Sequence, residues 1–162
     1  MLKKFALPVF AALLLGAGCN DDDNSSSAPS GDNAPLRYSG RLEVTPQEGS
    51  PFTAFSEEGI VFELKQDEEG RYLLWMPKIK FVAQMPVYVS FEVRGIDPTF
   101  DGQGGFRFSL DETVPYRNGA PYDPDGTGTY TIRSLEGSSA DGTTLATSFD
   151  CHSMHVAYSG SR

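Results

Sequence analysis

The feature that most constrains the fold of this chain is a strict alternation of apolar and polar residues in several short segments. In residues 36–45, apolar Leu42 and Val44 alternate with polar Arg41, Glu43 and Thr45. Residues 87–94 and 106–110 repeat the pattern. A period of two predicts β-strands that bury one face and expose the other. No segment keeps the helical period over the length of an ordinary helix, so we expect an all-β fold.

Eight segments of this kind follow one another along the chain. We predict strands at residues 36–45, 60–66, 72–76, 87–96, 106–110, 129–134, 143–151 and 154–160. Turn sequences separate them, including Asn118-Gly119 and Asp141-Gly142. Asx-Gly pairs readily adopt the positive φ angles of tight turns. Short connections then favour antiparallel pairing of sequential strands.

A short repeat indicates how such a sheet closes. Tyr38-Ser39-Gly40 in the first predicted strand recurs as Tyr158-Ser159-Gly160 in the last. If those two strands pair, the sheet forms an eight-stranded antiparallel up-and-down barrel, and the glycines allow the strands to bend. The alternative is a two-sheet β-sandwich.

The N-terminal segment predicts export. Lys3 and Lys4 precede an apolar run over residues 5–15, and small residues 16–18 lead to Cys19. This order is typical of a secretory signal, and the run is shorter than the roughly 20 residues that span a bilayer. It resembles a bacterial lipoprotein signal, in which Cys19 carries the lipid and residues 1–18 are removed. The resemblance implies an outer-membrane protein on the periplasmic or cell-surface side, which contacts the membrane through its anchor.

Residues 19–33 predict a tether, because they contain no apolar side chain large enough to build a core. Asp21-Asp22-Asp23 resembles the surface-export signal of Bacteroidetes lipoproteins, and the alternative is an ordinary solvated linker. We therefore expect one folded domain, over residues 34–162.

That domain resembles a known family at several strand positions. Tyr38, Gly40, Leu42 and Val44 look like the opening of the calycin-like (lipocalin-like) β-barrel domain of Bacteroidetes lipoproteins. Phe81 with Met85-Pro86-Val87 looks like its middle, and Tyr158 with Gly160 looks like its end. The resemblance implies a calycin barrel, a fold that often holds a small apolar ligand, and it transfers no ligand residue.

The charge balance excludes one class of partner. The chain has 13 Lys and Arg residues against 22 Asp and Glu residues, a net charge of −9. Nucleic acids require clustered cations, so we expect no nucleic-acid partner.

The residues that could carry chemistry are few. Cys151, His152 and His155 are metal-ligand types, but a closed zinc site needs four ligands and strand alternation turns Cys151 inward. A Cys–His hydrolase would need a third group that orients the imidazole. The sequence from Asp123 to Gly128 is read as an Asx-turn loop and not a calcium loop. We predict no cofactor, no metal and no enzyme activity.

The aromatic residues offer the better candidates. Trp75 and Tyr88 fall on the outward phase of adjacent predicted strands, where they could stack on sugars or contact a protein. Against that, the segment between Met76 and Pro86 is expected to fold over them. The predicted function is a binding module for a small apolar or glycan ligand. The alternative is a structural or adhesive surface protein with a filled barrel and no ligand.

Overall fold

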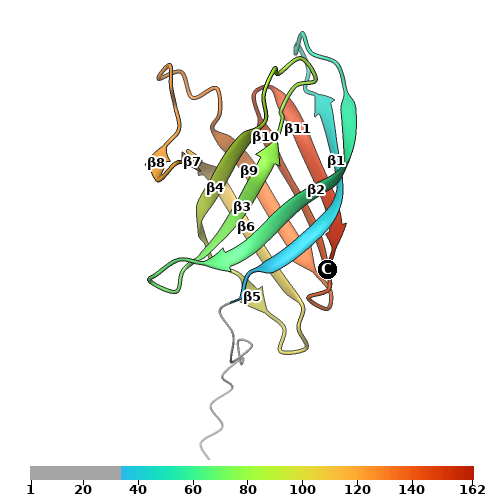
Figure 1. Ribbon diagram of the computed structural model, residues 1–162, viewed down its shortest axis with the longest axis vertical. Coiled ribbons are helices and arrows are strands. Elements are labelled where there is room, and N and C mark those ends of the chain that lie inside the picture. The colour runs from blue at the N-terminus through green and yellow to red at the C-terminus, as the bar shows by residue number, and fades with distance from the viewer. Residues whose placement is uncertain (1–33) are drawn as a thin grey trace, which may run out of the picture.

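The computed structural model describes residues 34–162, which form one antiparallel sheet of 11 strands (Figure 1). The predicted signal and tether lie outside these residues. The strands are β1 (Leu36–Pro46), β2 (Phe55–Gln66), β3 (Tyr72–Ile79), β4 (Val89–Ile96), β5 (Thr99–Phe100), β6 (Phe106–Thr113), β7 (Tyr116–Arg117), β8 (Ala120–Pro121), β9 (Ile132–Ser139), β10 (Thr144–Cys151) and β11 (Met154–Ser161). Within residues 34–162, no helix is long and apolar enough to cross a membrane.

The all-β prediction is confirmed, and the expected strand count of eight is not. The sequence did not predict β5, β7 and β8. Each has only two residues, which is too short to show an alternation of apolar and polar residues. The strand expected at residues 129–134 lies further along, as β9. Arg133 and Ser134 are both exposed and Ser134 has a φ of 51°, so a local irregularity breaks the alternation there.

The sheet curls into a half-barrel, with the strand order β5-β6-β9-β10-β11-β1-β2-β3-β4-β7-β8 (Figure 1). All strands belong to this one sheet, which rules out the two-sheet sandwich within the described residues. The hydrogen-bonded order is open between β4 and β6, whereas the sequence predicted full closure. The reason is local: β7 pairs with Glu92 of β4, and β5 pairs with Arg107 and Phe106 at the start of β6.

The first and last long strands do pair, as the repeated Tyr-Ser-Gly sequence predicts. Gly40 of β1 lies opposite Gly160 of β11. A Cβ atom on Gly40 would lie 1.9 Å from the carbonyl oxygen of Ser159, so no larger residue fits there without a backbone shift. The Tyr158 hydroxyl donates to the carbonyl oxygens of Tyr38, at 2.8 Å, and Ile60, at 3.3 Å. We call the paired strands β1 and β11, with Tyr38, Gly40, Tyr158 and Gly160, the seam.

Side chains fill the interior of the curled sheet. The buried residues from all eight longer strands and the loop after β3 form one connected hydrophobic cluster. Tyr158 stacks on Phe62 with ring centres 4.0 Å apart, and Phe108 lies directly over Gly137. The loop between β3 and β4 contributes Phe81, which is fully buried against Phe91. Burial of this order provides the main stabilisation of the domain, because no disulfide is present among residues 34–162.

Candidate functional site

Trp75 lies on the outer side of β3, where it is half-buried. Its Nε1–H donates to Ser90 Oγ on β4 at 3.2 Å. The Lys65 ammonium of β2 lies 4.1 Å from the centre of the indole ring. Three adjacent strands therefore fix the position of this ring, and a cation from the chain itself lies on one of its faces.

Tyr88 lies just before β4 and is held in a similar way. Its hydroxyl donates a short hydrogen bond to Glu57 Oε1, and this bond raises the pKa of Tyr88 above its usual value. The ammonium groups of Lys78 and Lys80 lie 4.1 Å and 4.4 Å from the centre of its ring. Both aromatic candidates are therefore covered by lysines. We call Trp75, Tyr88, Lys65, Lys78 and Lys80 the aromatic–lysine face.

The segment expected to fold over both rings does so only in part. It supplies Lys78 and Lys80 to Tyr88, but Phe81 turns into the core, and Trp75 is covered by Lys65 of β2. The sequence did not predict the lysines, because Lys65 meets Trp75 only through the register of β2 on β3. In that register Glu63 lies opposite Trp75 and Lys65 lies opposite Leu73.

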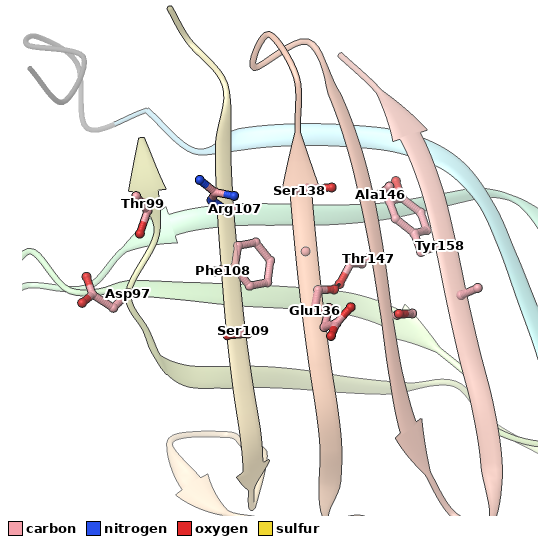
Figure 2. Close-up of a pocket in the computed structure, with 13 residues that line it drawn as sticks. Asp97, Thr99, Arg107, Phe108, Ser109, Glu136, Ser138, Ala146, Thr147 and Tyr158 are labelled. Atoms are coloured by element: carbon pink, nitrogen blue, oxygen red, sulfur yellow. Dashed lines mark hydrogen bonds between the residues drawn. The ribbon is translucent and has the colours of Figure 1, made fainter. Parts of the chain in front are cut away.

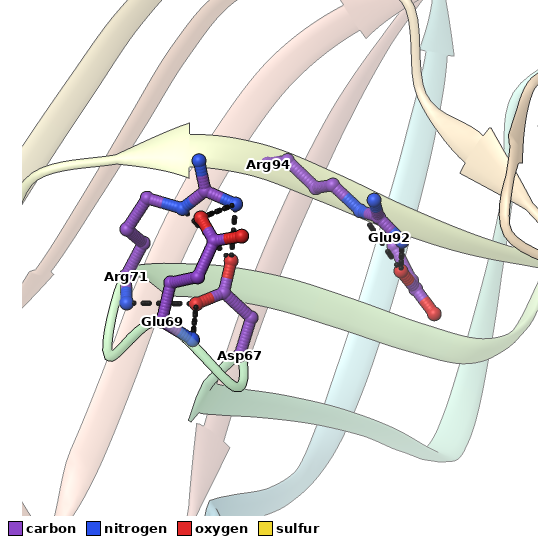
Figure 3. Close-up of polar contacts among 5 residues, drawn as sticks. All are labelled: Asp67, Glu69, Arg71, Glu92 and Arg94. Carbon is purple, nitrogen blue, oxygen red and sulfur yellow. Dashed lines mark hydrogen bonds and ion pairs between the residues drawn. The ribbon is translucent and has the colours of Figure 1, made fainter.

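Charged side chains surround this face in defined pairs. Glu63 lies 3.7 Å from the Arg37 guanidinium, and Glu92 lies 2.9 Å from that of Arg94. The Arg94 guanidinium also lies 4.1 Å from the centre of the Tyr116 ring. Figure 3 shows the Glu92–Arg94 pair. The carboxylates of Glu63 and Glu92 are therefore paired with arginines and not with the lysines.

A second ion-pair group closes the turn between β2 and β3 (Figure 3). Asp67 accepts hydrogen bonds from the backbone N–H groups of Glu69 and Arg71. The Arg71 guanidinium also contacts the carboxylates of Asp67 and Glu69. These bonds, led by that from the Arg71 backbone, lower the pKa of Asp67. These contacts stabilise the turn between β2 and β3, and they engage the charged groups of Asp67, Glu69 and Arg71 with one another.

The structure places Cys151, His152 and His155 in three different environments. Cys151 is 2% exposed in the core, and burial raises the pKa of its thiol. The His152 ring packs between Phe52 and Tyr130, with ring centres 5.2 Å and 5.5 Å away. His155 is exposed, and its Nδ1 lies 2.8 Å from Asp150 Oδ1. No group of three or more potential metal ligands is found within residues 34–162. Cys19, the predicted lipidation site, lies outside the described residues.

The loop from Asp123 to Gly128 uses its carboxylates for its own backbone, as predicted. Asp123 Oδ1 accepts from the Gly128 N–H at 3.0 Å. Asp125 Oδ1 accepts from the Thr127 hydroxyl at 2.8 Å and from the Thr127 N–H, and these bonds lower the pKa of Asp125. The contacts are those of an Asx-type turn.

Several clefts were not predicted from the sequence. One of about 640 Å³ crosses β6, β9, β10 and β11 (Figure 2). Its outward lining is mostly short side chains, such as Ser109, Ser138 and Ala146, between Arg107 and Glu136. These small residues at alternate strand positions are the signal that could have indicated it. A smaller one, of about 380 Å³, lies at the end of the half-barrel where the described chain begins, and is lined by Leu36, Phe100, Phe106 and Arg162 with three glycines and Asp141.

Comparisons of the chain with protein-family models, with curated proteins and with solved structures found no match.

Proposed function

We propose that this chain is a lipid-anchored, non-enzymatic surface protein whose β-domain binds a glycan on its outer side. The N-terminal signal pattern and Cys19 support the anchor and an outer-membrane location. Cys151 is buried in the core, His152 packs between two aromatic rings and His155 pairs with Asp150, and these separate surroundings support a role without metal or nucleophilic chemistry.

The single observation that carries the choice of ligand site is the contrast between the interior and the outer side. A calycin that holds a small apolar ligand needs space between its sheet faces. Here five large side chains are fully buried in one connected hydrophobic cluster: Tyr38, Phe62, Phe81, Phe91 and Phe149. Trp75 and Tyr88, in contrast, lie on the outer side and keep part of their surface exposed. Aromatic rings held at a fixed angle are suited to stacking on sugars.

We further propose that the domain is an eight-stranded calycin-like barrel. The eight strands of eight or more residues follow one another in up-and-down order, and β1 pairs with β11. Under this proposal β5, β7 and β8 are local additions at the two free edges, which they cover in part.

A glycan-panel experiment tests the function. The full-length chain in mild detergent is run by affinity electrophoresis through gels that contain neutral or acidic polysaccharides. We expect retardation by at least one polysaccharide, lost in Trp75→Ala and Tyr88→Ala and retained in Phe100→Ala, which removes an aromatic ring from the cleft at the end of the half-barrel. Equal retardation of all three variants would contradict the proposed site.

A structural or adhesive role is the second candidate, and the filled interior also favours it. It predicts that no polysaccharide in the panel retards the protein. It also predicts that cells carrying the protein adhere to surfaces or to one another, and that Trp75→Ala and Tyr88→Ala leave this adhesion unchanged.

A further inference from the structure

All lysines beyond Lys3 and Lys4 lie on one face of the domain. They are Lys65, Lys78 and Lys80, and each ammonium lies within 4.4 Å of the centre of the Trp75 or Tyr88 ring. The chain has a net charge of −9, so carboxylates are available over most of its surface. The lysines are gathered on two aromatic rings instead of being distributed among those carboxylates.

The three ammonium groups also lack an anionic partner within the part of the chain that the structure describes. Every ion pair there uses an arginine or a histidine as its cation. Three acids near these rings already have partners: Glu57 accepts from the Tyr88 hydroxyl, Glu63 pairs with Arg37 and Glu92 pairs with Arg94. Each lysine therefore keeps its N–H donors available for a ligand.

Contact with the rings prepares the lysines for binding. A lysine normally loses considerable rotamer freedom when it binds an anion, and the ring contacts restrict that freedom beforehand. Lys78 and Lys80 both lie against the Tyr88 ring, so two ammonium groups are available to an anionic group that binds at this ring. At least one cation lies against each ring, so a neutral sugar that stacks at that place would have to displace it, whereas an acidic sugar can bind to it.

We propose that the aromatic–lysine face binds an acidic glycan, with carboxylate or sulfate groups on Lys78 and Lys80 and a sugar ring against Trp75 beside Lys65. This inference rests on the proposed glycan-binding function and narrows its ligand class. Nucleic acids and anionic membranes fit this face less well. DNA carries one charge per roughly 1.7 Å of duplex and selects strongly basic surfaces. Anionic membranes select clusters of about four to eight cations.

The chain contains one tryptophan, so its fluorescence reports on this face directly. The full-length chain in mild detergent is titrated at low ionic strength with oligogalacturonate and with its methyl ester, which has the same sugar chain without the charges. We expect the acidic oligomer to change the emission of Trp75 and the ester to bind at least about tenfold more weakly, as for the loss of one charge-assisted hydrogen bond. Lys78→Gln/Lys80→Gln should weaken the acidic oligomer by about tenfold or more.

The matched control is Arg107→Gln/Arg133→Gln, which removes the same charge from β6 and β9 and should leave the affinity within about twofold, because distant exposed charges are screened. Equal binding of oligomer and ester would overturn the acidic-ligand inference and leave the glycan function standing. Equal weakening by both double variants would overturn the assignment to this face. Tighter binding of single-stranded DNA than of oligogalacturonate would also overturn it. If neither oligomer binds and the polysaccharide panel is also negative, inference and proposed function both fail.

Discussion

Tyr158→Phe is the sharpest perturbation of the seam, because it removes one oxygen and leaves the ring in place. The hydroxyl donates to two backbone carbonyls, of Tyr38 and Ile60, at the point where the pairing of β1 with β2 shifts register after Gly40. The stack of Tyr158 on Phe62, at 4.0 Å, does not require the hydroxyl. The variant therefore isolates the hydrogen bonds from the packing.

The expected loss in the free energy of unfolding is about 1–3 kcal/mol, the cost of leaving buried polar groups without their donor. For a domain of this size, that corresponds to a decrease in Tm of roughly 3–12 °C. The measurement is a thermal melt together with urea unfolding at neutral pH. Tyr116→Phe is the control, because within residues 34–162 the Tyr116 hydroxyl makes no hydrogen bond, and its loss should change stability by less than about 0.5 kcal/mol.

The same residue gives a second readout in alkali. Burial raises the pKa of Tyr158 to about 12, above the usual value of 10. A raised pKa in the folded state means that its stabilising contribution is fully present below pH 10 and is lost as the pH rises toward 12. The stability difference between the natural protein and Tyr158→Phe should therefore shrink over that window. A Tyr158→Phe variant as stable as Tyr116→Phe at neutral pH would refute the role of the hydroxyl in the seam.

Three further predictions concern the anchor, the core cysteine and the last strand. Cys19→Ser should leave the protein unprocessed or release it into the soluble fraction; normal processing with retention in carbonate-washed membranes would contradict lipidation. Cys151 should react slowly with a thiol reagent in the native state and rapidly after denaturation, since burial raises its pKa; rapid native labelling would show that the core opens there. Deletion of residues 154–162 removes β11 from between β10 and β1, so the chain should aggregate; a soluble monomer with a cooperative melt would contradict the seam.

The alternation of apolar and polar residues identified the long strands other than β9, because each buries one face against a single core; β9 lies further along the chain than expected. Tyr38 and Tyr158, the tyrosines of the repeated Tyr-Ser-Gly sequence, are both buried on the paired strands β1 and β11. The opening between β4 and β6 was not predictable in the same way. It depends on which short segments pair with the two edges, and Thr99–Phe100 and Tyr116–Arg117 are too brief to show a period.

The sequence predicted the aromatic residues of the candidate site but not its lysines. Strand alternation predicted that Trp75 and Tyr88 point outward, but it does not indicate which residues of other segments lie beside them. Lys65 is ten positions from Trp75 in the sequence, and only the register of β2 on β3 brings them together. Lys78 and Lys80 meet Tyr88 next to the place where the pairing of β3 with β4 shifts, between Met76 and Ile79. Cross-strand register of this kind is set by packing over the whole sheet.

Mapping of backbone amide chemical shifts during a glycan titration tests the central proposal most directly. With a polysaccharide fragment selected by the electrophoresis panel, we expect the largest shifts at residues 65, 75, 78, 80 and 88, and at Ser90, whose hydroxyl holds the Trp75 ring. Buried residues such as Phe62 and Phe149 should shift little. Largest shifts at Leu36, Phe100 and Phe106, or throughout the core, would place the ligand at the end of the half-barrel or inside it and contradict an outer-face site.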